Sequence, residues 1–200
     1  VDRQRVEVDG TPLPVAPGLV TYLLYKPPGV VSTVNDPEGR PTVVDLVPDA
    51  PRVVPVGRLD YESEGLMLMS NDGELILRVT HPRFGMAKTY VATVAGNPSS
   101  RSLRQLTVGI GLDDGVARAR RVRLIQAAPG RSMIELVMTE GRNREVRRML
   151  TAIGHPVERL VRTKIGPISD RKLGAGEWRR LEPTEVAQLY KAAGTQPPSS

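Results

Sequence analysis

The chain has 200 residues, of which 40% are hydrophobic and only 4% aromatic. This suits one domain, or two small lobes that share an aliphatic core. The 28 Lys and Arg residues outnumber 22 Asp and Glu residues, and the net charge of +6 favours polyanionic partners such as nucleic acid. The chain has no cysteine, which excludes disulfides, thiol nucleophiles and thiolate zinc sites, and no apolar run reaches the roughly 20 residues of a membrane helix.

The first 18 residues are predicted to stand apart from the rest. Residues 3–10 alternate apolar and polar side chains and end in Asp9-Gly10, a pattern that indicates a strand followed by a turn. The prolines that follow, with Gly18, indicate a linker. Because the chain starts without Met, we expect it to begin within a longer gene product. We therefore expect a domain over residues 19–194 and a disordered tail over 195–200.

Short strands dominate the remaining pattern, and helices are few. Strands are predicted at 21–25, 53–56, 66–69, 88–94, 116–125, 132–139, 157–161 and 178–181. Helices are predicted at 74–79, 144–153 and 184–193, and a helical turn is predicted at 102–106. Residues 35–55 are rich in Pro, Asp and Gly, so most of them are predicted to be loop. The pattern predicts an α+β fold with a mixed, largely antiparallel sheet, and it contains no dinucleotide fingerprint.

Gly57-Arg58-Leu59-Asp60 is the first segment that could carry chemistry. In an extended segment Arg58 and Asp60 share one face, while Leu59 anchors the other. A carboxylate held in this way can act as a nucleophile or a general base. The alternative is a surface Arg–Asp pair at a turn, and the four residues alone favour that alternative.

The predicted helix at 144–153 is the second such segment, with Asn143 as its cap and Gly154 at its end. Arg147 falls at the margin of the apolar face, from which a guanidinium can reach a buried carboxylate and keep it ionised. The alternative is an ordinary amphipathic helix with a solvated basic face. Tyr90 is the third candidate, because a tyrosine on a strand can either stack on a nucleobase or fill the core.

Together these segments resemble the RsuA/RluB/RluE/RluF family of bacterial ribosomal RNA pseudouridine synthases, and within it the RluB branch most. The matching segments are YLLYKPPGVVST at 22–33, GRLDYESEGLMLMSNDGEL at 57–75, KTYVATV at 88–94 and EGRNREVRRML at 140–150. The resemblance implies the pseudouridine synthase fold, with a central catalytic cleft in a sheet flanked by helices and loops. It also implies a small RNA-binding domain before residue 19, of which residues 1–18 would be the last strand and the linker.

The resemblance also implies roles for individual residues. Asp60 would be the catalytic nucleophile, Tyr90 would stack on the target base, and Arg147 would pair with the aspartate. Val146 would touch the extruded base, Arg58 would take its place in the RNA, and the segment that begins at Lys26 would support the cleft floor. Substrate contacts are further expected from the basic cluster over 142–148, namely from Arg142, Asn143 and Arg144.

The expected reaction needs no redox change or energy input, so no cofactor and no metal are expected. The expected partner is a stem-loop of large-subunit ribosomal RNA, and the expected protein is a cytoplasmic monomer without a membrane contact. A non-catalytic RNA-binding or ribosome-assembly protein would share the basic charge and the tyrosine. It would not explain a carboxylate in a cleft for anionic RNA, where that group repels phosphate. A hydrolase that uses Asp60 is a weaker alternative, because no second carboxylate or histidine lies at a suggestive spacing.

Overall fold

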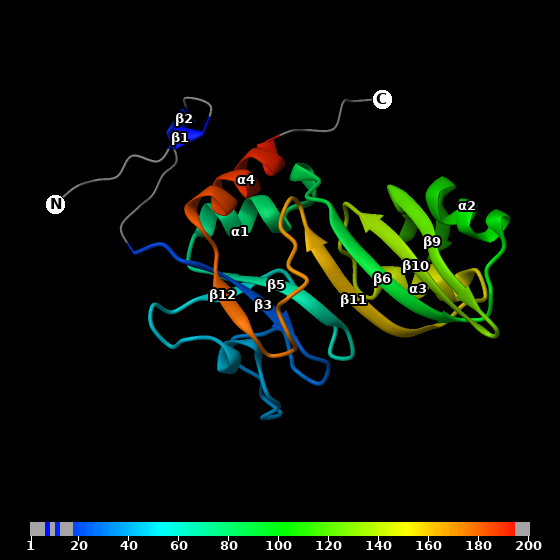
Figure 1. Cartoon of the computed structure of the whole chain (residues 1–200), viewed down its shortest axis with the longest axis horizontal. Helices are drawn as coiled ribbons and strands as arrows, with labels where there is room; N and C mark the ends of the chain where they lie inside the picture. Colours follow the sequence, from blue (N-terminus) through cyan, green and yellow to red (C-terminus); the bar gives the residue numbers. More distant parts are fainter. Residues whose placement is uncertain (1–6, 9–10, 13–17, 195–200) are drawn as a thin grey trace.

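The computed structural model of the chain describes residues 7–8, 11–12 and 18–194. Its centre is an eight-stranded sheet in which seven strands follow the order β12-β3-β5-β11-β6-β10-β9, while β4 also pairs with β5 (Figure 1). The strands are β3 (Thr21–Lys26), β4 (Val54–Val56), β5 (Glu64–Ser70), β6 (Lys88–Ala95), β9 (Arg121–Ala128), β10 (Arg131–Met138), β11 (Val157–Ile165) and β12 (Trp178–Arg180). Only β5 and β11 pair in parallel within this sheet, which confirms the mixed, largely antiparallel sheet.

Four helices and two short hairpins complete the part of the chain that the structure describes. The helices are α1 (Gly73–Thr80), α2 (Ser100–Val108), α3 (Glu145–Ala152) and α4 (Pro183–Gly194), with 3-10 turns η1 (Val43–Leu46) and η2 (Pro82–Phe84). The hairpins pair β1 (Glu7–Val8) with β2 (Thr11–Pro12), and β7 (Ile110–Leu112) with β8 (Gly115–Ala117). The predicted turn at 9–10, the linker prolines beyond β2 and the tail at 195–200 lie outside the described residues, so the predicted domain boundaries stay predictions.

Apolar side chains form one core on each face of the sheet, because successive residues of a strand point to opposite faces. Tyr90, Ala92 and Val94 of β6 face α3 and pack with Met149 and Leu150, as the alternation in this strand predicts. On the other face, one set of side chains packs between the sheet and the helices α1 and α4. Its members include Leu23, Leu66, Leu68, Leu75, Val79 and Leu189.

Three local predictions differ from the structure. The strand predicted at 116–125 is split, because its chain leaves β8 after Ala117 and enters the main sheet only at Arg121. The turn predicted at 102–106 is the centre of a full helix, α2, whose Ser99 hydroxyl accepts a hydrogen bond from the Ser102 amide at 3.1 Å. The loop predicted at 35–55 also contains η1 and the start of β4.

The start of α3 is also different from the prediction. Arg144 rather than Asn143 precedes the first helical residue, with a left-handed backbone at φ 48° and without a side-chain cap. The Asn143 carbonyl instead accepts a hydrogen bond from Arg148 Nε at 2.9 Å. At the other end Gly154 follows the helix with φ 83°, as a glycine after a helix C-terminus commonly does. None of the described helices is both long and apolar enough to span a bilayer.

Candidate active site

Asp60 lies in the loop between β4 and β5, and its neighbours fix that loop. Leu59 is buried, and one hydroxyl group forms hydrogen bonds with both its carbonyl and its amide. Ser32 Oγ donates to the Leu59 carbonyl at 2.7 Å and accepts from the Leu59 amide at 3.1 Å. The Ser63 amide then donates to the Asp60 carbonyl at 3.0 Å and closes a turn. The aspartate therefore sits on a fixed backbone, with its side chain free to face a cavity.

Lys26 anchors the same loop from below. Its side chain is completely buried, and Nζ donates to the carbonyls of Pro27 at 2.9 Å, Tyr61 at 3.3 Å and Ser63 at 2.7 Å. Burial lowers the pKa of Lys26 to about 8, while attraction to the Asp60 carboxylate opposes that shift. Lys26 does not line the pocket itself. Its position beneath the Asp60 loop is compatible with the expected support of the cleft floor.

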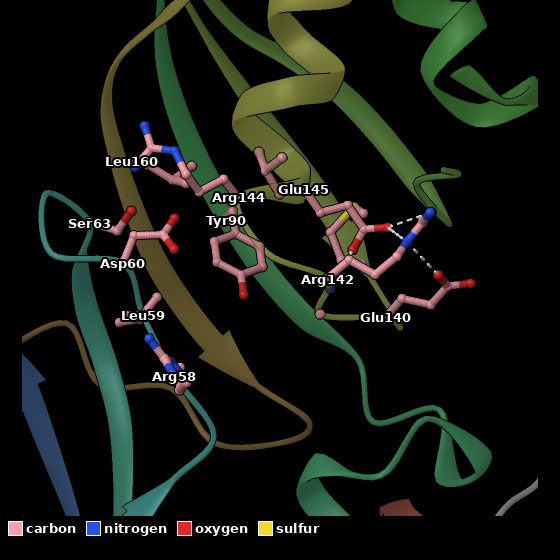
Figure 2. A pocket seen from close by; sticks show the side chains of 13 residues that line it. Arg58, Leu59, Asp60, Ser63, Tyr90, Glu140, Arg142, Arg144, Glu145 and Leu160 are labelled. Carbon is pink, nitrogen blue, oxygen red and sulfur yellow. Dashed lines mark hydrogen bonds and ion pairs between the residues drawn. The ribbon is translucent and has the colours of Figure 1, made fainter. Parts of the chain in front are cut away.

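A cavity of about 60 Å³ opens beside the aspartate. In Figure 2 the Asp60 carboxylate points across this cavity toward the ring of Tyr90. The lining residues come from the Asp60 loop, from β6, β10 and β11, and from the start of α3. They are Arg58, Leu59, Asp60, Ser63, Tyr90, Met138, Glu140, Gly141, Arg142, Arg144, Glu145, Val146 and Leu160. Of the residues singled out in the sequence, Asp60, Tyr90, Val146, Arg58, Arg142 and Arg144 therefore meet in one pocket.

The two candidates for base contact lie on different elements. Tyr90 comes from β6 and Val146 from the first turn of α3, and each belongs to the core while it also lines the pocket. The two readings of Tyr90 are thus compatible: the ring packs on one side and borders the cavity on the other.

Arg147 does not pair directly with Asp60. Its Nη2 donates to Ser63 Oγ and its Nη1 donates to the Val157 carbonyl, both at 3.3 Å. Burial lowers the pKa of Arg147, and attraction to Glu62 and Asp60 opposes that shift. Arg147 Nε has no hydrogen-bond partner among the described residues. The expected direct ion pair is absent because the guanidinium donates instead to Ser63, which closes the turn, and to Val157 of β11. The positive charge of Arg147 still interacts with Asp60 over a longer distance.

Arg142 is held by acidic side chains rather than left free for RNA. It forms ion pairs with Glu145 at 3.0 Å, Asp114 at 3.2 Å and Glu140 at 3.3 Å (Figure 2 draws those to Glu140 and Glu145). Burial raises the pKa of Glu145, and the Arg142 contacts oppose that shift. Arg148 pairs with the same Asp114 at 2.8 Å. This network fastens the start of α3 to the β7–β8 hairpin. A substrate contact by Arg142 would therefore compete with its ion pairs to these carboxylates.

Arg144 and Arg58 are the exposed cations of the pocket. Arg144 pairs with Glu62 at 2.5 Å, and that hydrogen bond raises the pKa of Arg144 and lowers the pKa of Glu62. The Arg58 side chain is exposed, while its carbonyl accepts from Arg162 Nη1 at 3.4 Å. Asn143, another predicted contact, is exposed but does not line the cavity.

Arg162 is a residue of the site that the sequence analysis missed. It lies on β11, is only 2% exposed, and donates from Nε to the Leu66 carbonyl at 2.7 Å. A Cβ on Gly65 would stand 2.3 Å from the Arg162 carbonyl oxygen, so only glycine permits this close approach. The strand also contains Glu158, Arg159 and Lys164, so nothing in the local sequence distinguished Arg162.

Metal-binding groups do not gather in this region. Within residues 7–8, 11–12 and 18–194, no three His, Asp or Glu side chains lie close enough to hold a metal ion. The chemistry available in the pocket is that of a carboxylate, an aromatic ring and several guanidinium groups.

A carboxylate that faces an aromatic ring in an arginine-rimmed pocket suits an enzyme that acts on a nucleobase. Residues 20–152 match the family described as RNA pseudouridylate synthase, and the chain belongs to that family. The ribosomal large subunit pseudouridine synthase B of Bacillus subtilis is 43% identical, over 87% of this chain and 72% of the relative. An uncharacterized RNA pseudouridine synthase of Aquifex aeolicus is also 43% identical, over 94% of this chain and 76% of the relative.

Solved structures agree with this assignment. A crystal structure of a pseudouridylate synthase matches with a TM-score of 0.75 and 30% identity, over 89% of this chain and 76% of that chain. An archaeal box H/ACA Nop10–Cbf5 complex matches with a TM-score of 0.59 at 17% identity, over 78% of this chain and 51% of that chain. This second likeness concerns the fold alone. The predicted fold class and the resemblance to the RluB branch are confirmed.

Proposed function

We propose that this enzyme converts a uridine of bacterial large-subunit ribosomal RNA into pseudouridine, with Asp60 as its nucleophile. The observation that carries the proposal is the Asp60 carboxylate opposite the Tyr90 ring in a pocket lined by arginines. The likeness to large-subunit pseudouridine synthases B of several bacteria supports the choice of RNA. Such a substrate would place the enzyme in the bacterial cytoplasm, and we propose that it acts as a monomer on a stem-loop.

The target base must leave its stack before the carboxylate can reach it. Extrusion costs a few kcal/mol and is cheapest in a loop or bulge. Tyr90 and Val146 border the cavity from two sides, so a uracil that enters would lie between an aromatic ring and an aliphatic side chain. Arg58, exposed at the same pocket, would occupy the space that the base leaves in the RNA.

The isomerisation breaks the bond from C1′ of the ribose to N1 of uracil and forms a bond from C1′ to C5. N1 gains a proton and C5 loses one, so no redox partner is required. The Asp60 carboxylate starts this sequence by attack at C1′, by attack at C6 of the base, or by removal of a ribose proton. Lys26, Arg144 and Arg147 are each attracted by Asp60, so three positive charges surround the group that starts each route.

Replacement of the nucleophile provides the first prediction. Asp60→Asn keeps the size of the side chain but removes its charge, so we expect pseudouridine formation to cease while RNA binding stays near wild type. The assay would follow pseudouridine in an unmodified transcript of Bacillus subtilis large-subunit RNA, with binding measured on the same transcript.

Asp49→Asn is the matched control, because Asp49 is exposed and does not line the Asp60 pocket. It should retain full activity. Substantial turnover by a pure Asp60→Asn preparation would refute the nucleophile. If the wild-type protein binds RNA but forms no pseudouridine in any transcript, the alternative of a non-catalytic RNA-binding protein is favoured instead.

A further inference from the structure

The ion pair between Arg144 and Glu62 connects the two walls of the pocket. Glu62 follows Asp60 by two residues in the loop before β5, and Arg144 directly precedes α3. The pocket between these walls has a volume of about 60 Å³ and opens to solvent. Arg144 lines this pocket and Glu62 does not, so their ion pair lies at its border.

Arg144 differs from the other paired arginine of the pocket in how easily it can change partner. The side chain of Arg142 is 23% exposed and binds several groups of the hairpin and of α3, including the Glu145 carboxylate, which is 4% exposed. The side chains of Arg144 and Glu62 are 43% and 56% exposed. Exposed pairs are weak and readily screened by water and salt, so another anion can take the place of Glu62.

The backbone at Arg144 presents its side chain in a defined direction. Its φ of 48° and ψ of 29° are left-handed, a conformation that costs energy in a residue other than glycine and that tends to occur at functional sites. The Arg148 amide donates to the Arg144 carbonyl at 2.9 Å, so the residue is tied into the first turn of α3. The positive end of the α3 dipole lies at the same position.

We propose that Glu62 occupies, in the RNA-free enzyme, the site on Arg144 of an RNA phosphate beside the extruded uridine. A guanidinium binds carboxylate and phosphate oxygens with the same planar donor geometry. The phosphodiester displaces Glu62, and the exposed Glu62 carboxylate is then left in solvent while Arg144 holds the phosphate. The inference rests on the proposed function, since it takes RNA as the substrate.

Glu62→Gln tests this competition directly. The variant removes the competing charge, so RNA should bind about three- to sixfold more tightly at about 0.05 M salt. This is the factor expected when Arg144 no longer has to break a weak ion pair with Glu62 before it binds a phosphate. Binding would be measured in the Asp60→Asn background, which blocks turnover, on the Bacillus subtilis large-subunit RNA transcript. Glu74→Gln is the matched control, because Glu74 is 50% exposed and pairs with Arg78 on α1, outside the pocket.

Arg144→Asn completes the test, since Asn adopts the left-handed conformation more readily than most residues. It should weaken binding and reduce the slope of log affinity against log salt by about 1, and Arg144→Lys should retain most of the slope. Glu62→Gln should have no further effect once Arg144 is Asn. The inference is overturned if Glu62→Gln binds no more tightly than Glu74→Gln, or if its gain persists without Arg144. If these binding differences hold but wild-type enzyme makes no pseudouridine, the proposed reaction fails while the phosphate site stands.

Discussion

Lys26 donates three hydrogen bonds from its ammonium group, two of them to the loop that carries Asp60. The three acceptors are the carbonyls of Pro27, Tyr61 and Ser63. A neutral amine has only two N–H donors, so deprotonation of Lys26 must release one carbonyl. The position of the Asp60 loop therefore depends on the charge of a lysine that does not line the pocket.

This dependence predicts an alkaline limit to activity. The pKa of Lys26 is lowered from 10.5 to about 8, so turnover should fall as pH rises through about 8. Stability should change in the opposite direction: between about 8 and 10.5 the unfolded chain binds more protons at this lysine than the folded chain does, and its contribution to stability rises with pH. A profile of kcat against pH, measured with the unfolding midpoint at each pH, separates the two effects.

Lys88 provides the control for this profile. Burial also lowers its pKa to about 8, but it donates to the carbonyls of Val79 and Met86, at 3.3 and 3.5 Å, rather than to the Asp60 loop. Lys88→Met should keep the alkaline limit, whereas Lys26→Arg, with a permanent charge, should move it to higher pH. Loss of the limit in Lys88→Met would contradict the assignment to Lys26.

The sequence identified the residues of the site better than their contacts. The family resemblance was sufficient to expect Asp60 and Tyr90 in one cleft, whereas the four residues around Asp60 alone favoured a surface pair. The direct pairing of Arg147 with Asp60 was not found, because a helical wheel gives the direction of a side chain but not its competing acceptors, here Ser63 Oγ and the Val157 carbonyl. Arg162 was missed because its partners are main-chain carbonyls, which leave no pattern of residue types.

At the scale of elements, α3 is positioned from both sides. The β7–β8 hairpin binds its first turn through Asp114, which pairs with Arg142 and Arg148. The apolar face of α3 packs into the core with Tyr90 and Ala92 of β6. The wall of the pocket that carries Val146 and Arg144 is thus an element clamped between a sheet and an acidic hairpin.

Asp114→Asn should loosen this clamp without unfolding the protein. We expect faster amide hydrogen exchange over Ile110–Leu112 and Gly115–Ala117, since the hairpin loses its charged contacts with α3. The unfolding midpoint should stay close to wild type, because exposed ion pairs contribute little to global stability. Asp113→Asn is the control: its side chain is 92% exposed and lies 3.8 Å from Arg148, so its exchange pattern should match wild type.

The elements themselves were predictable where a periodic pattern was continuous. Strand β6 and the helices α1 and α4 follow their apolar spacing closely, whereas β8 and β9 were merged into one strand. Both have β-rich sequences, and the tertiary contact that separates them, Arg120 N donating to the Val137 carbonyl at 2.8 Å, is invisible in a local pattern. The start of α3 was misplaced for a related reason, because Asn143 is a better cap by propensity but Arg144 is held by Glu62 and Arg148.

At the scale of the whole molecule, two cores share one sheet. Leu136 of β10 belongs to the core beneath α3, and Leu68 of β5 belongs to the core beneath α1 and α4. Both leucines are completely buried. Because the strands between them are hydrogen-bonded in one continuous sheet, neither core can open without exposing backbone groups of the other.

Truncation of either leucine should therefore destabilise the entire chain. We expect Leu136→Ala and Leu68→Ala each to lower the free energy of unfolding by about 2–5 kcal/mol, with a single transition retained. Urea unfolding followed by the fluorescence of Trp178 and by far-ultraviolet circular dichroism would test this, since coincident curves indicate two-state behaviour. Leu77→Ala, at a site 39% exposed, should change the midpoint little, and separate transitions for the two probes would contradict a shared sheet.

The parallel contact between β5 and β11 has a consequence for the timing of activity during protein synthesis. Arg162 of β11 reaches back to the carbonyls of Arg58 and Leu66, and Leu160 of the same strand lines the pocket. A nascent polypeptide that has left the ribosome only as far as α3 already carries Asp60, Tyr90 and Val146, yet it lacks the strand that joins the β5 and β6 portions of the sheet. The growing chain thus lacks a complete pocket until β11 has been synthesised and has paired with β5 and β6.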